Sequence, residues 1–309
     1  MKLYKVCLNS SELTCYQAQT LLYFKCLCSV MKSLDVMKSH IGVVQMRSSD
    51  QLEDNLSFSH RKIQKAADKG VDLIAFPETF LYVGKDNQEK HRVAQSLDGE
   101  IVQTFREYAD KYQLSILLGS IYEKILDDTE RLYNTSILIN RQGEINGVYR
   151  KIHMCDAPAL GYNESDGIKP GNIPVVVDHE IGKIGLSICY DLRFPELYRD
   201  LTAKGAEIIF VPSAFFLYTG KHHWLPLLIA RAIENQVYIV APNQWGEHHE
   251  GRTSYGSSVV IDPWGSIVCC ASERPEVVST IIDLGYLNEV RGNMPILSHR
   301  RPEIYTPNT

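Results

Sequence analysis

The sequence predicts an α/β fold in which two mixed β-sheets pack face to face, with helices on the outside. Strand–helix–strand units, such as 41–76 and 183–211, alternate along the chain with β-hairpins such as 132–151. A doubly wound sheet of parallel strands would not contain so many hairpins. Residues 71–76 are also nearly continuously apolar, which is typical of a strand with both faces buried.

The predicted elements of the first half follow from apolar periodicity and from helix-terminating residues. A strand at 41–46 leads into a helix at 51–69, which has one apolar face and is stopped by Gly70. After the strand at 71–76, Asp98 is expected to cap a helix that runs to Tyr112. A strand at 114–121 and a hairpin of 132–140 with 145–151 complete this half.

The second half begins with a long irregular segment, 153–172, and loops of that length are commonly functional or disordered. A hairpin of 173–178 with 183–188 precedes a helix that opens at Pro195 and ends at Gly205. The remaining prediction is a strand at 206–211, a helix at 225–236, a strand at 237–241, a hairpin of 257–261 with 266–270, a strand at 277–283, and a short helix from Tyr286 before a proline-rich tail.

Composition excludes several classes of function. The 309 residues carry a formal net charge of −5, so nothing favours binding to nucleic acid or to an anionic membrane. No apolar run approaches the roughly 18 residues that a membrane span requires. The eight cysteines form no C-x-x-C pair, which favours reduced thiols in an intracellular protein. We therefore expect a cytoplasmic protein.

The N-terminal residues 1–38 are expected to be a poorly ordered extension. They contain five Lys and no Arg. A cleaved mitochondrial presequence is the alternative interpretation, although such segments are usually rich in Arg. No linker divides the remainder, so residues 39–309 are predicted to form a single domain.

Cys189 has the position of a nucleophile, at the end of the apolar strand 184–188 and just before a helix. A cysteine there projects its sulfur at the edge of a sheet, and the backbone N–H groups that follow it, beginning with Tyr190, face the same point. The alternative is a small buried hydrophobic residue, which is the commoner role of a lone cysteine.

Two other polar residues stand where strands end. Glu78 follows the apolar run 73–77, and Lys151 follows the strand 145–150. An acid, an ammonium and a thiol on three strand ends can converge in one pocket as a thiol amidase. Glu78 would move the proton, Cys189 would form a thioester, and Lys151 with the Tyr190 N–H would stabilise the oxyanion. Taken alone, a solvated glutamate cap and a surface lysine are the commoner interpretations.

The blocks Phe76–Thr79, Tyr149–His153 and Ser187–Leu197 resemble the three signature segments of the nitrilase, or carbon–nitrogen hydrolase, superfamily. The resemblance covers about residues 40–305. It implies a four-layer α-β-β-α sandwich and a catalytic triad of Glu78, Lys151 and Cys189. It also assigns to Glu164 the role of a second glutamate that positions substrate and lysine, whereas the residue pattern alone indicates a surface loop position there.

Further segments resemble the Nit branch of that superfamily, and the ending 299–302 resembles its deaminated glutathione amidase group. The resemblance implies a small amide substrate, hydrolysed with water to 2-oxoglutarate and cysteinylglycine. Such an anionic substrate favours a cation in the pocket, and Arg193 is the nearest candidate. The alternative role of Arg193 is a structural ion pair with a buried carboxylate.

Two other functions stay open at this point: an omega-amidase acting on 2-oxoglutaramate or 2-oxosuccinamate, and a scaffold that does not need the triad. No cofactor is implied. The pairs His222-His223 and His248-His249 lack a third ligand at a recognisable zinc spacing, so no metal is expected. The resemblance also implies a homodimer or larger homo-oligomer that pairs through the helices at 194–205 and 225–236.

Overall fold

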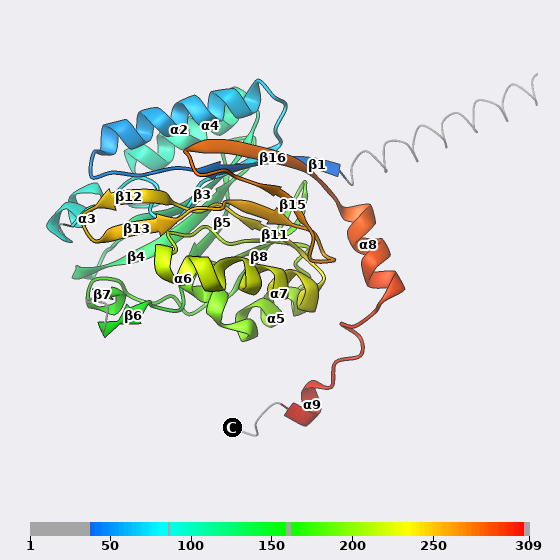
Figure 1. The fold of residues 1–309 in the computed structure, drawn as a ribbon. Helices are drawn as coiled ribbons and strands as arrows, with labels where there is room; N and C mark the ends of the chain where they lie inside the picture. The colour runs from blue at the N-terminus through cyan, green and yellow to red at the C-terminus, as the bar shows by residue number, and fades with distance from the viewer. Residues whose placement is uncertain (1–37, 86, 159–161, 306–309) are drawn as a thin grey trace, which may run out of the picture.

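The computed structural model describes residues 38–85, 87–158 and 162–305 (Figure 1). The expected extension at 1–38 lies outside the described residues except for Lys38, which begins the first strand. No helix in the described ranges is long and apolar enough to cross a membrane.

The first of two six-stranded sheets has the spatial order β16-β1-β2-β3-β4-β5. Its three central strands are parallel, whereas β16, β4 and β5 join by antiparallel pairing. The strands are β1 (Lys38–Gln45), β2 (Leu73–Ala75), β3 (Ser115–Ile125), β4 (Asp128–Ile139), β5 (Ile145–Arg150) and β16 (Glu276–Asp283). The predicted hairpin of 132–140 with 145–151 is therefore confirmed.

The second sheet has the order β15-β14-β11-β10-β9-β8 and is also mixed. Strands β9, β10 and β11 are parallel, and the outer pairings are antiparallel. The strands are β8 (Val175–His179), β9 (Gly182–Leu186), β10 (Ile208–Phe210), β11 (Tyr238–Ala241), β14 (Val259–Ile261) and β15 (Ile267–Cys270).

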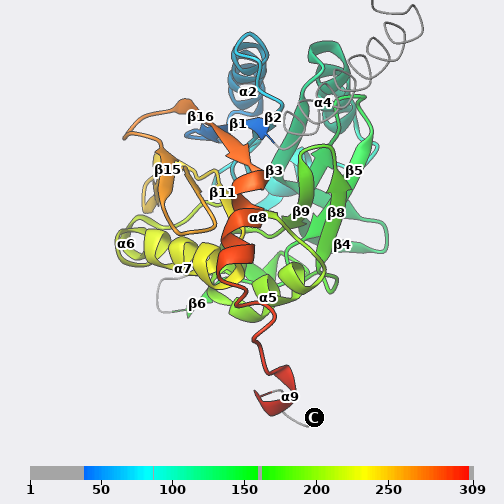
Figure 2. The same ribbon diagram turned by 90° about the vertical axis from the view of Figure 1, so that its right-hand side faces the viewer.

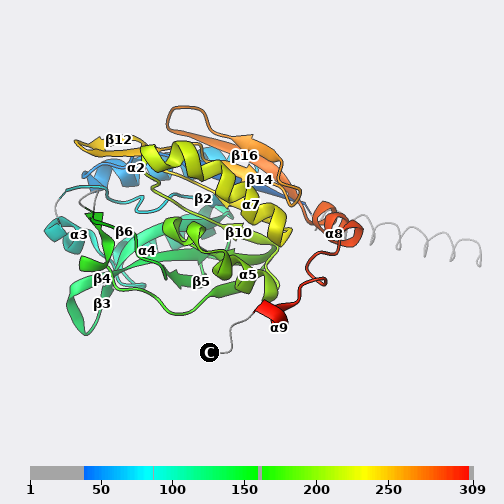
Figure 3. The same cartoon turned by 60° about the horizontal axis from the view of Figure 1, so that its bottom comes forward.

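Successive side chains of a strand point to opposite faces of its sheet. The structure therefore contains one hydrophobic layer between the sheets and one beneath each pair of outer helices. Val43 of β1 packs between the sheets against residues of the second sheet such as Phe210, whereas its neighbour Val44 faces helices α2 (Leu52–Ala67) and α4 (Glu100–Tyr112). Ile209 of β10 faces α5 (Pro195–Ala203) and α7 (Leu225–Asn235). Figure 2 shows these two helix pairs on opposite outer faces, and Figure 3 shows α5 and α7 in front of the sheets. The predicted sandwich of two mixed sheets with outer helices is confirmed.

Several elements differ from the prediction. The hairpin β12 (Trp245–His249) with β13 (Arg252–Tyr255) was not predicted, nor were α3 (Asn87–Val93), the short pair β6 (Asp156–Ala157) with β7 (Tyr162–Asn163), and the helical segment formed by α6 (Leu217–Thr219) and η4 (Gly220–Trp224). Asp98 is not the N-cap of α4, because Gly99 occupies that position and makes no side-chain cap. The C-terminal α8 (Leu284–Asn293) is capped by Asp283, and α9 (Pro302–Tyr305) extends away from the sandwich (Figure 1).

Chain direction decides where the site can form. Strand β5 is antiparallel to β4, and β4 is antiparallel to β3, so β5 runs in the same direction as β2 and β3. Glu78 after β2 and Lys151 after β5 therefore emerge at the same edge of the first sheet. Cys189 follows β9 of the facing sheet.

Gly119 of β3 allows the segment that carries Glu78 to lie against that strand. A Cβ at this position would overlap the carbonyl oxygens of Phe76 and Pro77. The Phe76 N–H also donates to the Leu117 carbonyl at 3.0 Å. The position of Glu78 therefore depends on residue 119 being glycine.

We predict that Gly119→Ala lowers the free energy of unfolding by about 1–3 kcal/mol, because a well-packed region must move. It should also displace Glu78 and reduce turnover. Gly292→Ala in α8 is the matched control, since a Cβ there meets no atom within 4 Å. Urea unfolding of both variants measures the difference, and equal stabilities would contradict the account.

Candidate active site

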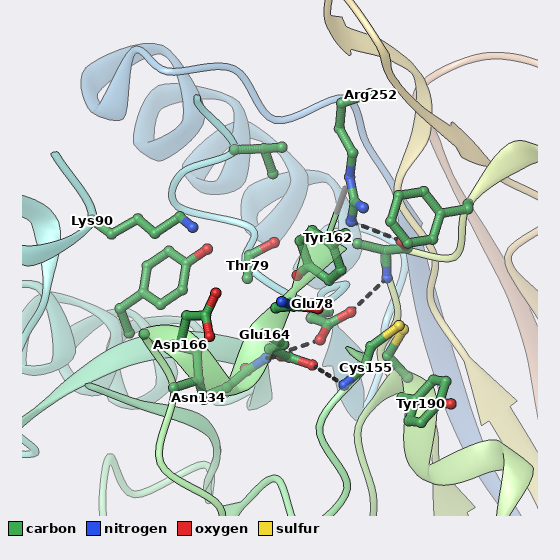
Figure 4. Close-up of a pocket in the computed structure, with 18 of the residues that line it drawn as sticks. Glu78, Thr79, Lys90, Asn134, Cys155, Tyr162, Glu164, Asp166, Tyr190 and Arg252 are labelled. Atoms are coloured by element: carbon green, nitrogen blue, oxygen red, sulfur yellow. Dashed lines mark hydrogen bonds between the residues drawn. The ribbon is translucent and has the colours of Figure 1, made fainter. Parts of the chain in front are cut away.

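Glu78, Lys151 and Cys189 line one cavity of about 580 Å³ between the ends of the two sheets (Figure 4). Glu164, from the segment after β5, lines the same cavity. The residues Glu78, Lys151 and Glu164 are nearly inaccessible to solvent, with exposures of 4%, 2% and 6%. The structure therefore brings together the four side chains that the sequence reasoning and the resemblance selected.

The Glu78 carboxylate is held by donors from both sheets. Its Oε1 accepts from Asn134 Nδ2 and from Lys151 Nζ, each at 2.9 Å, and its Oε2 accepts from the Ala214 N–H at 2.9 Å. Burial acts to raise the pKa of Glu78, but the Lys151 charge and hydrogen bonds from Cys189, Lys151 and Asn134 outweigh it. The pKa of Glu78 is lowered, so the carboxylate is ionised and able to accept a proton.

Lys151 lies between two buried carboxylates. Its Nζ donates to both oxygens of Glu164 at 2.8 Å, in addition to Glu78. Burial acts to lower the pKa of Lys151, but the charges of Glu164 and then Glu78 raise it well above its ordinary value. Lys151 is therefore a fixed cation and not a proton donor at neutral pH. Glu164 is itself held by the Cys155 N–H at 2.8 Å and by Asn134 at 3.3 Å.

Cys189 begins a short 3₁₀ turn, η3 (Cys189–Arg193), with a φ of 48° in the left-handed region. Non-glycine residues seldom adopt that region, and strained residues of this kind are enriched at active sites. Its N–H donates to the Pro212 carbonyl at 2.9 Å. Burial, and then the nearby Glu78 charge, raises the pKa of the Cys189 thiol well above its ordinary value, against the effect of Lys151.

Asp191 fixes this turn and was not singled out from the sequence. It is fully buried and accepts from the Tyr149 hydroxyl at 2.6 Å and from the Ile188 N–H at 2.9 Å. It also lies 2.7 Å from Nδ1 of His153. Asp191 thereby links the segment that carries Lys151 to the turn that carries Cys189.

Tyr190 and Arg193 lie on the wall next to the nucleophile. Both line the cavity, and the Arg193 guanidinium stacks 5.5 Å from the Tyr190 ring and 5.2 Å from the Phe215 ring. Its Nη1 is 3.3 Å from Nδ1 of His223. Within the described part of the chain, no carboxylate forms an ion pair with Arg193. The structural ion pair that was its alternative role is therefore absent there.

Three further residues of the cavity were missed by the sequence reasoning. Asn134 lies within strand β4, and Ala214 acts through its backbone, so neither carries a recognisable sequence signal. Arg252 belongs to the unpredicted hairpin, where a charged residue among His and Gly resembles an ordinary surface loop.

These contacts define the resting chemistry of the site. The proton resides on Cys189, the negative charge on Glu78 and the positive charge on Lys151. A thiol beside a carboxylate base can attack an electrophilic carbonyl as the base removes its proton. An adjacent fixed ammonium can stabilise the oxyanion that this attack creates. The arrangement is suited to acyl transfer through a thioester.

Comparison with known proteins identifies the family. The family model described as carbon–nitrogen hydrolase matches residues 40–292. The "Deaminated glutathione amidase" of Dictyostelium discoideum is 42% identical over 275 residues, which cover 86% of this chain and 94% of that protein. The protein of the same name from Homo sapiens is 40% identical over 271 residues, which cover 86% of this chain and 83% of that protein.

Solved structures agree with the fold. The NitFhit protein of C. elegans is similar with a TM-score of 0.82 and 40% identity, covering 87% of this chain and 66% of that chain. Nit3 of Saccharomyces cerevisiae, described as a member of branch 10 of the nitrilase superfamily, has a TM-score of 0.76 and 30% identity, covering 84% of this chain and 95% of that chain. The superfamily predicted from the three motif blocks is confirmed.

We predict that Lys151→Met destabilises the fold by about 3–5 kcal/mol at neutral pH, because it leaves buried carboxylates without their cation. In the variant, unopposed burial raises the folded pKa of Glu78 above its unfolded value of about 4.3. Glu78 then stabilises the folded state below its unfolded pKa. This contribution is lost as the pH rises through its folded pKa.

The deficit of Lys151→Met should therefore be larger at pH 7.5 than at pH 4.5 when urea unfolding is measured at both values. Lys183→Met is the control, because Lys183 pairs with Asp178 at the exposed surface and should contribute less than about 1 kcal/mol. A deficit that is the same at both pH values would contradict this account of the cluster.

Proposed function

Because the chain belongs to the carbon–nitrogen hydrolase family, we propose that it is a cysteine-dependent amidase that hydrolyses deaminated glutathione to 2-oxoglutarate and cysteinylglycine. The observation that carries the proposal is the buried contact of Glu78 with Lys151 in a cavity that Cys189 also lines. Relatives about 40% identical over 86% of this chain bear the name of that activity.

The first half-reaction forms a thioester. Cys189 Sγ attacks the carbonyl carbon of the scissile amide while Glu78 accepts the thiol proton. The Lys151 ammonium and the Tyr190 N–H stabilise the oxyanion of the tetrahedral intermediate. Glu78 then passes the proton to the amide nitrogen, the C–N bond breaks, and cysteinylglycine leaves.

The second half-reaction consumes water. Glu78, again a carboxylate, removes a proton from a water molecule that attacks the thioester carbonyl. The C–S bond breaks, the proton returns to the Cys189 sulfur, and 2-oxoglutarate is released. Glu164 acts as a positioning residue in both steps, because its two bonds to Lys151 keep the ammonium directed at the oxyanion.

The cavity fits an anionic substrate of this size. Its volume of about 580 Å³ lies within the range of sites that enclose drug-sized molecules. Arg193, without a carboxylate partner in the described ranges, offers a bidentate donor for a substrate carboxylate. An omega-amide such as 2-oxoglutaramate would use the same triad, and relative turnover separates the two substrates.

The proposal extends to the organisation of the protein. Residues 39–309 act as one hydrolase domain, in the cytoplasm or in mitochondria, and assemble as a homodimer or larger homo-oligomer through α5 and α7. Exposed apolar side chains near α7, Ile233 at 47% and Trp264 at 54%, support a contact on that face.

We predict that purified protein releases cysteinylglycine from synthetic deaminated glutathione and that Cys189→Ala and Glu78→Gln each reduce kcat by at least about 100-fold. Cys270→Ala is the control, because Cys270 is an exposed thiol on β15. Turnover of 2-oxoglutaramate that greatly exceeds turnover of deaminated glutathione would instead indicate an omega-amidase.

The dependence of kcat/KM on pH should show no inflection near pH 6.5, where histidine ordinarily titrates. Because the pKa of Glu78 is lowered and that of Cys189 is raised, the reactive protonation state persists from about pH 5.5 to about pH 8.5. We expect kcat/KM to be flat over that interval. An inflection near pH 6.5 that persists when His153 and His223 are each replaced by Gln would count against Glu78 as the base in its present environment.

A further inference from the structure

Arg252 of β13 lines the catalytic cavity with unused hydrogen-bonding capacity. Its Nη2 donates to the Ala214 carbonyl at 3.2 Å, but its Nη1 is buried and has no acceptor among the described residues. Within those residues it also forms no ion pair with a carboxylate. A buried donor without an acceptor is costly, so a rotation of the guanidinium that brings Nη1 against a ligand in the cavity would be favourable.

Aromatic rings hold this guanidinium at the wall. Its Cζ lies 4.0 Å from the Phe216 ring and 5.4 Å from the Tyr162 ring, and those two rings meet edge to face. Arginine stacked in this way is restricted in orientation, so binding an anion costs less conformational entropy.

Arg252 and Arg193 lie on different walls of the cavity. Arg193 lies over the Tyr190 ring and Arg252 over the Phe216 ring, and Figure 4 shows Tyr190 and Arg252 apart from each other. Two guanidinium groups therefore line the cavity, one on the nucleophile turn and one on the hairpin β12–β13.

A further positive charge reinforces the Arg252 side. Lys90 of α3 lines the same cavity, and Figure 4 shows its ammonium directed inward. Burial, and next the charge of Arg252, lowers the pKa of Lys90, while Glu164 acts in the opposite direction. An anion bound between the two cations would relieve their repulsion.

Deaminated glutathione carries a carboxylate at each end, with the scissile amide between them. One belongs to the 2-oxo acid portion and the other to the glycine of the leaving dipeptide. Small omega-amides such as 2-oxoglutaramate have the first carboxylate and lack the second. Two separate guanidinium groups in the cavity match the two carboxylates of the longer substrate.

We propose that Arg252 binds the glycine carboxylate of the cysteinylglycine portion and thereby selects deaminated glutathione over small omega-amides. The inference rests on the proposed function and adds to it a residue that sets specificity. Arg193 then receives the carboxylate of the 2-oxo acid portion, which both classes of substrate share.

The test compares the activities of two proteins on three substrates. Wild type and Arg252→Gln are assayed with deaminated glutathione, with its C-terminal glycinamide analogue, and with 2-oxoglutaramate. The ratio of kcat/KM for deaminated glutathione to that for 2-oxoglutaramate should fall by about 10- to 100-fold in the variant, which is the effect of losing a charge-assisted hydrogen bond. The glycinamide should be a poor substrate for wild type, and the variant should not discriminate further against it.

Arg92→Gln is the matched control for loss of positive charge. Arg92 is an exposed residue of the same helix as Lys90, pairs with Glu89, and does not line the cavity. Arg92→Gln should change the ratio of kcat/KM for the two substrates by no more than about twofold. Arg252→Lys should restore part of the ratio, because it keeps the charge but not the planar fork.

Each result bears on the inference. A similar fall for all three substrates in Arg252→Gln would overturn it, because it would show a structural role near Ala214 or a contact with the shared carboxylate. An unchanged ratio would also overturn it while leaving the proposed function intact. Wild type that fails to hydrolyse deaminated glutathione would overturn the proposed function, and this inference with it.

Discussion

The Lys151 ammonium between the carboxylates of Glu78 and Glu164 is the interaction on which the rest of the site depends. Three charges that are almost entirely buried are stable only when each is paired and its remaining donors and acceptors are bonded. The required partners come from separate parts of the chain: Asn134 in β4, the Cys155 N–H in the segment after β5, and the Ala214 N–H beyond β10. Forming the cluster therefore fixes the edges of both sheets relative to each other.

The same cluster stores the nucleophile as a thiol. Free thiolate is the reactive form of cysteine, and it is also the form that oxidises. Burial and the Glu78 charge keep the proton on Cys189 until a carbonyl is in place, whereas the fixed charge of Lys151 needs no proton transfer to act. The neighbouring Cys155 is protonated as well, because burial raises its pKa to about 11. Two protonated thiols therefore line the cavity, and Cys189 is the one hydrogen-bonded to Glu78.

The ends of β2 and β9 could be located from the sequence because apolar runs stop there, and the end of β5 followed from the hairpin turn at residues 141–144. Sequence reasoning shortened β3 and missed the start of β4, since residues 122–131 are mostly charged and polar and show no apolar alternation. It also missed the hairpin of Arg252, whose strands are short and contain few apolar residues. Glu164 required the family resemblance, because its burial results from the distant Lys151. Contacts of that kind are created by the fold and leave no local pattern.

The central claim is that Cys189, activated by Glu78, carries the acyl group. The most direct measurement is rapid quenching of the protein with deaminated glutathione, followed by mass spectrometry of its peptides. We expect a 2-oxoglutaryl thioester on the peptide that contains Cys189, released by hydroxylamine and absent from Cys189→Ala. An acyl group on Cys155, or turnover by Cys189→Ala at the rate of wild type, would contradict the account.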